Sequence, residues 1–271
     1  MFPVEQTNIL ENPRQRRNYV YLEHTQSLCS KCLRVVDAKI LRTDDNKIVL
    51  RKWCAEHGFE SCLLHSDADW YLHAQKYNRP GDIPLKFPTE VERGCPYDCG
   101  VCPDHEQHMC LGLIDLTDDC NLACPTCFAD SKGSAYLTID QVKASLDGFI
   151  EQEGVGAVIQ FSGGEPTMHP EIVEAVKEAV TRPTEVVMIN TNGIKFAQDE
   201  DLIKRLVDVS ENKLEIYLQF DGFTDEVHQA IRGAKLADIK MKAIENMLKH
   251  GLPINLAAVI QRGVNEDQVG K

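Results

Sequence analysis

Eleven cysteines, all between Cys29 and Cys127, are the residues of this 271-residue chain with the clearest capacity for chemistry. They fall into three groups, and cysteines that merely filled a core would not segregate in this way. A disulfide scaffold is typical of short secreted chains, but this chain is long and its N-terminus has no apolar signal segment. In a reducing compartment, clustered cysteines more often bind metal. We therefore expect a cytoplasmic protein whose cysteines bind metal or iron–sulfur clusters.

The third group carries the strongest signal. Cys120, Cys124 and Cys127 have the spacing CX3CX2C and directly follow the apolar run 111–117. Three thiolates can hold a [4Fe–4S] cluster while leaving one iron without a protein ligand, and that open iron can bind a small molecule. A zinc knuckle or a set of buried thiols is the alternative.

A glycine-rich turn follows the next apolar run. Gly163 and Gly164 would let the backbone approach a ligand closely, and Glu165 would supply an acceptor for a cationic group. Pro166 would direct the chain into the following helix. Alone, this GGEP turn could be an ordinary strand-to-helix connection, but together with the cysteine triplet it indicates a ligand site.

The second cysteine group, which lies between residues 95 and 110, repeats the CX3CX2C spacing and adds a fourth thiol. Four thiolates suit a fully ligated auxiliary [4Fe–4S] cluster. A zinc site is the alternative, because His105 and His108 lie close by in the sequence. We assign the open cluster to the later triplet, since that one alone follows a buried strand and precedes the GGEP turn. The members of the second group are Cys95, Cys99, Cys102 and Cys110.

The first group resembles a rubredoxin-like or zinc-ribbon knuckle. Cys29 and Cys32 form one half and Cys54 lies on the other. The fourth ligand is either His57 or Cys62. His57 together with thiolates would favour zinc, whereas Cys62 would permit mononuclear iron.

The elements that must position these residues alternate along the chain. Strands are expected at 111–117, 156–161, 185–190, 214–220 and 253–260, and helices at 139–150, from 170, at 201–209 and at 236–250. This order predicts an α/β fold with a parallel sheet, in which chemistry lies at the carboxyl ends of the strands. We expect three parts: an N-terminal metal-binding module (1–85), an auxiliary cluster segment (86–110) and a core (111–271).

The composition excludes several classes of protein. Hydrophobic residues make up 43% and charged residues 26% of the chain, which rules out disordered, collagen-like and coiled-coil proteins. No apolar run approaches the roughly 20 residues that span a bilayer. The net charge of −13 argues against nucleic acid as a partner, because an acidic surface repels phosphate backbones.

The core resembles the radical S-adenosylmethionine (radical SAM) superfamily in its CX3CX2C loop, in Phe128 beside the last cysteine, and in the GGEP turn. The runs 190–193 (NTNG) and 218–222 (LQFDG) are similar to the family's third and fourth strand ends. The resemblance implies a partial (β/α)6 TIM-barrel-like core with about five strands present. It also implies SAM on the open iron, with Gly163, Gly164 and Glu165 at its amino group. Asn192 and Asp221 would contact its ribose or carboxylate, the alternative being polar turn residues.

The resemblance further implies the chemistry. A low-potential donor such as ferredoxin or flavodoxin would reduce the cluster, and cleavage of SAM would give a 5′-deoxyadenosyl radical that abstracts hydrogen from an unactivated C–H bond. A multi-cluster electron-transfer protein without SAM, and a scaffold that binds zinc at every site, are the competing hypotheses. The GGEP turn favours the enzyme.

The order of knuckle, second group and core resembles the subgroup of tetraether lipid synthases and dihydropterin methyltransferases. We expect carbon–carbon bond formation on a lipid alkyl chain first, with possible peripheral membrane contact, and methyl transfer to a pterin-like small molecule second. The resemblance implies a sixth strand and a further C-terminal portion, whereas this chain ends at Lys271, just after the fifth expected strand. We therefore expect this sequence to be part of a longer protein.

Overall fold

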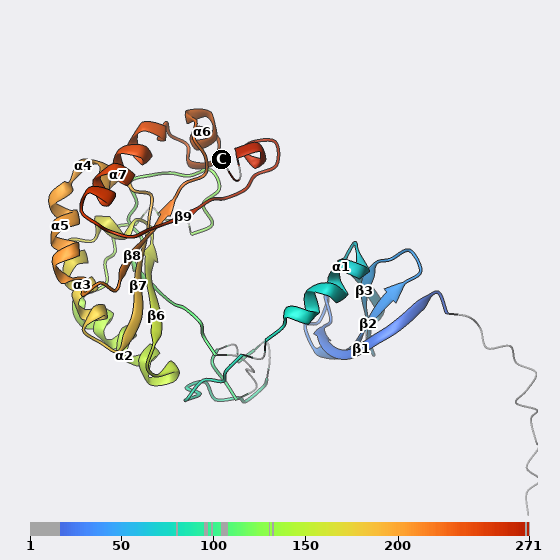
Figure 1. The fold of residues 1–271 in the computed structure, drawn as a ribbon. Helices are drawn as coiled ribbons and strands as arrows, with labels where there is room; N and C mark the ends of the chain where they lie inside the picture. The colour runs from blue at the N-terminus through green and yellow to red at the C-terminus, as the bar shows by residue number, and fades with distance from the viewer. Residues whose placement is uncertain are drawn as a thin grey trace, which may run out of the picture. The chain divides into compact units, whose positions relative to one another are not determined.

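The computed structural model describes residues 17–79, 81–94, 97–98, 100–103, 108–129, 131, 133–268 and 270. These residues form two compact units (Figure 1). The first takes in the described residues within 1–81 and 91–99, and the second those within 82–90 and 100–271. The predicted three-part division stays a prediction.

The N-terminal unit is a four-stranded antiparallel sheet in the order β1-β2-β3-β4. Short turns join the strands, and Asn46 and Gly58 take the left-handed backbone conformation that two of these turns require (φ 60° and 76°). The buried apolar cluster is small and centres on Ile40, Ile48 and Ala68. The elements are β1 (Tyr19–Leu28), β2 (Val35–Thr43), β3 (Ile48–Cys54), β4 (Gly58–His65), α1 (Ala68–Ala74) and the 3-10 turn η1 (Gln75–Tyr77).

The core unit is a five-stranded parallel sheet in the order β5-β6-β7-β8-β9, which confirms the predicted α/β class. Its strands are β5 (Gly112–Thr117), β6 (Ala157–Gly163), β7 (Thr184–Thr191), β8 (Leu214–Gln219) and β9 (Ile254–Ala257). Its helices are α2 (Ile139–Glu153), α3 (Ile172–Val180), α4 (Ile194–Gln198), α5 (Glu200–Val209), α6 (Asp225–Arg232) and α7 (Ala237–Lys249), with 3-10 turns η2 (Pro166–Met168) and η3 (Glu266–Gln268).

One face of this sheet carries the hydrophobic core. Helices α2, α3, α5 and α7 lie along that side of the strands in Figure 1. Alternate strand residues, such as Leu116, Phe161 and Ile189, are fully or almost fully buried against them. Because strand side chains alternate, the residues between them project from the opposite face, which we call the inner face.

Local signals set the helix boundaries. The Thr138 side chain accepts the Gln141 amide while the Gln141 side chain accepts the Thr138 amide, so the predicted capping box starts α2. Helices α4 and α6, by contrast, were not foreseen. Helix α6 ends at Gly233, whose φ of 76° is left-handed.

The helices of the described residues are all too short or too polar to cross a membrane.

Strand β9 is shorter than the run 253–260 suggests. Beyond Ala257 the chain leaves the sheet, and the Val259 amide donates to the Asp221 carboxylate (2.9 Å) instead of to a neighbouring strand. The Asn265 side chain then donates to the carbonyls of Asp221 (2.7 Å) and Val259 (2.8 Å). The segment after β9 is thereby fastened to the carboxyl end of β8.

Candidate active site

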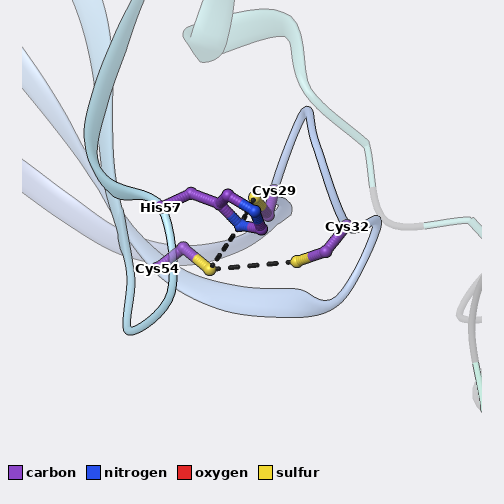
Figure 2. A group of neighbouring side chains, drawn as sticks. All are labelled: Cys29, Cys32, Cys54 and His57. Atoms are coloured by element: carbon purple, nitrogen blue, oxygen red, sulfur yellow. Dashed lines mark hydrogen bonds between the residues drawn. The ribbon is translucent and has the colours of Figure 1, made fainter.

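Four side chains of the N-terminal unit converge into one metal-binding group. The ligand atoms of Cys29, Cys32, Cys54 and His57 all lie within 4.8 Å of one another, and three of them are the thiols of the predicted knuckle (Figure 2). The His57 Nδ1 atom is 3.5 Å from the Sγ atoms of both Cys29 and Cys54, and Cys32 Sγ is 3.8 Å from Cys54 Sγ. Cysteine and histidine ligand atoms at these distances from one another match a tetrahedral metal site.

The structure places the other candidate ligand, Cys62, outside this group. Cys62 is exposed on β4 and pairs with Leu50, whereas Cys54 pairs with Gly58 at the end of the same hairpin. Four residues of extended strand put about 13 Å between these positions. Of the two candidates for the fourth ligand, His57 is therefore the one that lies close to the three thiols, in the turn between β3 and β4.

The amides of the knuckle prepare one thiol for metal binding. The backbone N–H groups of Cys32 and Lys31 lower the pKa of the Cys29 thiol to about 6. The Arg34 amide acts in the same direction on Cys32, but burial and the neighbouring thiols outweigh it, so that the pKa of Cys32 is raised. A thiolate is the form that ligates metal, and such amides favour it.

The CX3CX2C loop leaves the sheet at the carboxyl end of β5. Cys120 and Cys124 are partly buried and Cys127 is exposed, and the Cys127 amide donates to the Cys124 carbonyl (3.1 Å). Burial raises the pKa of Cys120, and the negative charge of Glu165 adds to the effect. Phe128, which follows Cys127 in the sequence, is fully exposed, and a contact of this ring with the cofactor stays a prediction.

The GGEP turn packs against the start of this cysteine loop. The Gly164 amide donates to the Thr117 carbonyl (2.7 Å) and the Glu165 amide to the Asp119 carbonyl (2.8 Å). A Cβ at Gly163 would lie 2.3 Å from the Thr117 oxygen, and one at Gly164 would lie 2.0 Å from the Asp119 oxygen. The missing side chains of these glycines admit the backbone of residues 117–119. Their expected role in the approach of a ligand stays a prediction.

Glu165 is buried, and the protein itself satisfies its carboxylate. One oxygen accepts from the hydroxyls of Thr167 and Thr191 (2.7 Å each), and the other accepts from the Asn192 amide (2.7 Å). The Asn192 side chain in turn donates to Asn121 Oδ1 (2.7 Å), within the cysteine loop. Glu165 and Asn192, both predicted SAM contacts, therefore link the ends of β6 and β7 to the loop.

Asp221 lies at the end of β8 in a buried ion pair. Its two oxygens accept from Arg232 Nε (2.6 Å) and Nη2 (2.8 Å), and the side chains are 0% and 9% exposed. Burial opposes ionisation, but Arg232 and the Val259 amide keep the pKa of Asp221 below its ordinary value. The predicted SAM contact Asp221 is thus engaged with Arg232 at the C-terminus of α6.

That end of α6 also touches the cysteine loop. The Thr126 hydroxyl donates to the Ile231 carbonyl (3.1 Å). A Cβ on Gly233 would approach the Ala123 oxygen (3.2 Å) and the ring of Pro125 (3.3 Å). Helix α6 therefore forms a seat for the loop, with the Arg232 guanidinium close enough to interact with the Cys124 thiol.

Lys240, on α7, is a fully buried cation that the sequence did not reveal. Its Nζ donates to the carbonyls of Asn192 and Gln219, the latter at 2.6 Å, and so joins the carboxyl ends of β7 and β8. Burial and the positive charge of Arg232 lower the pKa of Lys240 to about 8. The sequence signal that could have predicted its burial is its position on the apolar side of an amphipathic helix.

The second cysteine group is described only in part. Cys102 is partly buried and Cys110 is exposed, while Cys95 and Cys99 lie outside the described residues. His105 also lies outside them, whereas His108 pairs with Glu153 on α2 (3.3 Å). The auxiliary cluster stays a prediction.

Comparison with known proteins identifies the core. Residues 114–271 match the Radical SAM superfamily, and residues 21–66 match the HMPTM N-terminal zinc ribbon domain. The chain belongs to the radical SAM superfamily. The predicted family and the predicted Cys-rich N-terminal module are thereby confirmed.

Several named proteins are similar to this radical SAM protein. The 7,8-dihydro-6-hydroxymethylpterin dimethyltransferase of Methanocaldococcus jannaschii is 38% identical over 250 residues, 91% of this chain and 48% of that protein. GTP 3',8-cyclase of Chlorobaculum tepidum is 29% identical over 159 residues, 58% of this chain and 46% of that protein. The solved structure of anSMEcpe with bound AdoMet is 24% identical, with a TM-score of 0.46 over 55% of this chain and 43% of that chain. The chain spans about half the length of the pterin dimethyltransferase, as the 48% coverage shows.

The family implies a [4Fe–4S] cluster and SAM, and the residues of the core fit them. Three thiols lie on one loop at the carboxyl edge of a parallel sheet. Among the described residues, the N-terminal group alone has its ligand atoms within 4.8 Å of one another, the density that a single ion needs. A cubane cluster instead distributes its thiolates over separate iron atoms, which suits the wider triplet.

Proposed function

We propose that this protein is a radical SAM methyltransferase that acts on a pterin-type small molecule. One observation carries the proposal: the 38% identity to the pterin dimethyltransferase runs through 91% of this chain, so it includes the zinc ribbon as well as the core. Of the two predicted substrates, the comparisons favour the pterin over the lipid alkyl chain. Coupling of alkyl chains has no support among the named relatives.

The cluster and SAM together supply a carbon-centred radical when both are bound. Cys120, Cys124 and Cys127 would hold the cluster, and residues 163–165 would lie beside the SAM amino group. The chain's own contribution is positional. The Asn192–Asn121 and Thr126–Ile231 hydrogen bonds hold the cysteine loop against the end of β7 and the C-terminus of α6.

For the N-terminal group we propose a structural zinc ion. Three thiols and one imidazole form a closed tetrahedral set, which is typical of structural zinc sites. The buried apolar cluster beside it is small, and domains with little core commonly depend on a metal for their stability. We also propose that a low-potential donor such as ferredoxin or flavodoxin reduces the core cluster, and that Cys95, Cys99, Cys102 and Cys110 bind an auxiliary cluster.

The test uses anaerobically reconstituted protein with SAM, dithionite and 7,8-dihydro-6-hydroxymethylpterin. We expect mass spectrometry to show the pterin with one or two added methyl groups, together with 5′-deoxyadenosine from the SAM that is cleaved and S-adenosylhomocysteine from the SAM that donates each methyl group. Cys124→Ala should abolish both the methylated pterin and 5′-deoxyadenosine, whereas Cys62→Ser, outside all three proposed metal groups, should give wild-type amounts. SAM cleavage that the pterin neither accelerates nor converts into methylated product would contradict the proposal.

A further inference from the structure

The inner face of the core sheet carries a continuous layer of side chains. The strand register aligns Asp115 with Ser162, Asn190 with Tyr217, and Tyr217 with Asn255. A hydrogen bond from Asn190 Nδ2 to Ser162 Oγ (3.3 Å) joins the two halves. Five adjacent strands thus each contribute one polar or aromatic side chain at the same level of the sheet.

Most of the amide groups in and beside this layer are already used. Asn190 Oδ1 accepts from Gln219 Nε2 (3.1 Å), and Asn255 Nδ2 donates to Glu215 Oε2 (2.6 Å). Asp115 differs from these residues. It is exposed, and among the described residues its carboxylate has no hydrogen-bond or ion-pair partner. The strand beside it offers the Ser162 hydroxyl, which accepts from Asn190 and keeps its own proton to donate.

The charge of the inner face limits the chemical class of ligand that can bind there. None of the strands β5 to β9 contains a lysine, an arginine or a histidine, while Asp115 and Glu215 place two carboxylates on the inner face. A triphosphate or a carboxylate ligand would meet repulsion there. A neutral ring rich in N–H donors would meet acceptors.

We propose that Asp115 is a specificity-determining residue that binds a 2-amino-4-oxopyrimidine ring, with Ser162 donating to the ring's carbonyl. This inference rests on the function proposed above and deepens it. Such a ring presents an N–H and an NH2 side by side, and an ionised carboxylate accepts that pair with both oxygens, as it does from arginine. The ring carbonyl next to this pair would face β6, because adjacent strands lie about 4.8 Å apart.

Pterins and guanine nucleotides share this ring. The absence of basic residues from the five described strands favours the pterin, because a guanine nucleotide also carries phosphates. The binding assay therefore includes GTP as a separate arm. Tighter binding of GTP than of 6-hydroxymethylpterin would overturn the assignment of substrate.

The experiment measures the affinity of reconstituted, SAM-loaded protein for 6-hydroxymethylpterin and for the corresponding lumazine, in which a carbonyl replaces the 2-amino group. The wild type should prefer the pterin by about tenfold or more, the value of one charge-assisted hydrogen bond. Asp115→Asn should lose that preference. Glu215→Gln is the matched control: it removes one carboxylate charge from the same face and should keep the preference.

The outcomes separate this inference from the proposed function. If Asp115→Asn binds and discriminates like the wild type, the assignment of Asp115 is wrong while the methyltransferase proposal stands. If the wild type neither binds nor methylates the pterin, the proposed function fails and the inference fails with it. Should Asp115→Asn not fold, as judged by circular dichroism, Asp115→Glu replaces it. Asp115→Glu keeps the two carboxylate oxygens that accept hydrogen bonds, so it should still bind the pterin more tightly than the lumazine. If it binds the pterin and the lumazine equally well, and both with wild-type affinity, the proposed role of Asp115 is refuted.

Discussion

The ion pair between Asp221 and Arg232 allows a sharp test of how the core is held together. The two side chains are 0% and 9% exposed and meet through two hydrogen bonds of 2.6 and 2.8 Å, and the Val259 amide adds a third to Asp221. Asp221→Asn keeps the shape but removes the charge that offsets the Arg232 guanidinium. An uncompensated buried charge costs about 3–5 kcal/mol. Since a domain is stable by only about 5–15 kcal/mol, this variant should lose a large share of its stability.

The assay must read the core separately from the N-terminal unit. The two tryptophans of the chain, Trp53 and Trp70, both lie in the N-terminal unit, so tryptophan fluorescence reports on that unit. Circular dichroism at helical wavelengths reports on the core instead, because α2 to α7 all belong to it while the N-terminal unit has only the short helix α1. In guanidinium, Asp221→Asn should lower the midpoint of the dichroism transition and leave the fluorescence transition in place.

The control is the Arg182–Asp147 pair, which has similar geometry at the surface. Arg182 Nε and Nη2 donate to Asp147 at 2.7 and 3.3 Å, but the Asp147 side chain is 65% exposed. Asp147→Asn should therefore cost at most about 1 kcal/mol. A double variant, Asp221→Asn with Arg232→Met, should be more stable than the sum of the single changes predicts, because the orphaned charge is gone. If Asp221→Asn costs no more than Asp147→Asn, burial of this pair does not govern its energy and the argument fails.

Three further changes give separable results. His57→Ala should lose the bound metal of the N-terminal unit, whereas Cys62→Ser should keep it, as measured by metal analysis after dialysis; equal metal content in both would contradict the ligand assignment. Gly164→Ala should prevent cluster assembly, because its Cβ would lie 2.0 Å from the Asp119 oxygen, whereas Gly148→Ala, in open space on α2, should stabilise the core by about 0.5–1 kcal/mol; normal iron and sulfide content in Gly164→Ala would argue against close packing. Lys240 has a folded pKa of about 8 against an ordinary 10.5, so below pH 8 both states hold its proton and the full cost of burying the charge is present. Between about pH 8 and 10.5 the unfolded chain binds more protons, so the free energy of unfolding should rise with pH in the wild type relative to Lys240→Met; parallel pH profiles would refute the depressed pKa.

Interactions between residues close in sequence could be predicted from the sequence. The capping box at Thr138 and Gln141 formed as expected, and the five predicted strands all appear in the sheet. The CX3CX2C triplet and the GGEP turn indicated the family without any coordinates. These features depend on backbone hydrogen bonds and side-chain periodicity over a few residues, so their spacing alone defines them. The amphipathic patterns of α4 and α6 were too short to be recognised.

Contacts between distant residues were decided by the tertiary structure. Spacing left His57 and Cys62 equivalent as ligands, and only the hairpin register of β3 and β4 separates them. The partner of Asp221 is Arg232, eleven residues away on α6, a helix that the sequence pattern did not predict. Asp115 resembled any polar residue of a strand until parallel pairing placed it beside Ser162 on the inner face. Sequence determined which residues can do chemistry, because that is a property of single side chains and short spacings. The pairing of strands determined which of them meet, because register and packing depend on the whole sheet at once.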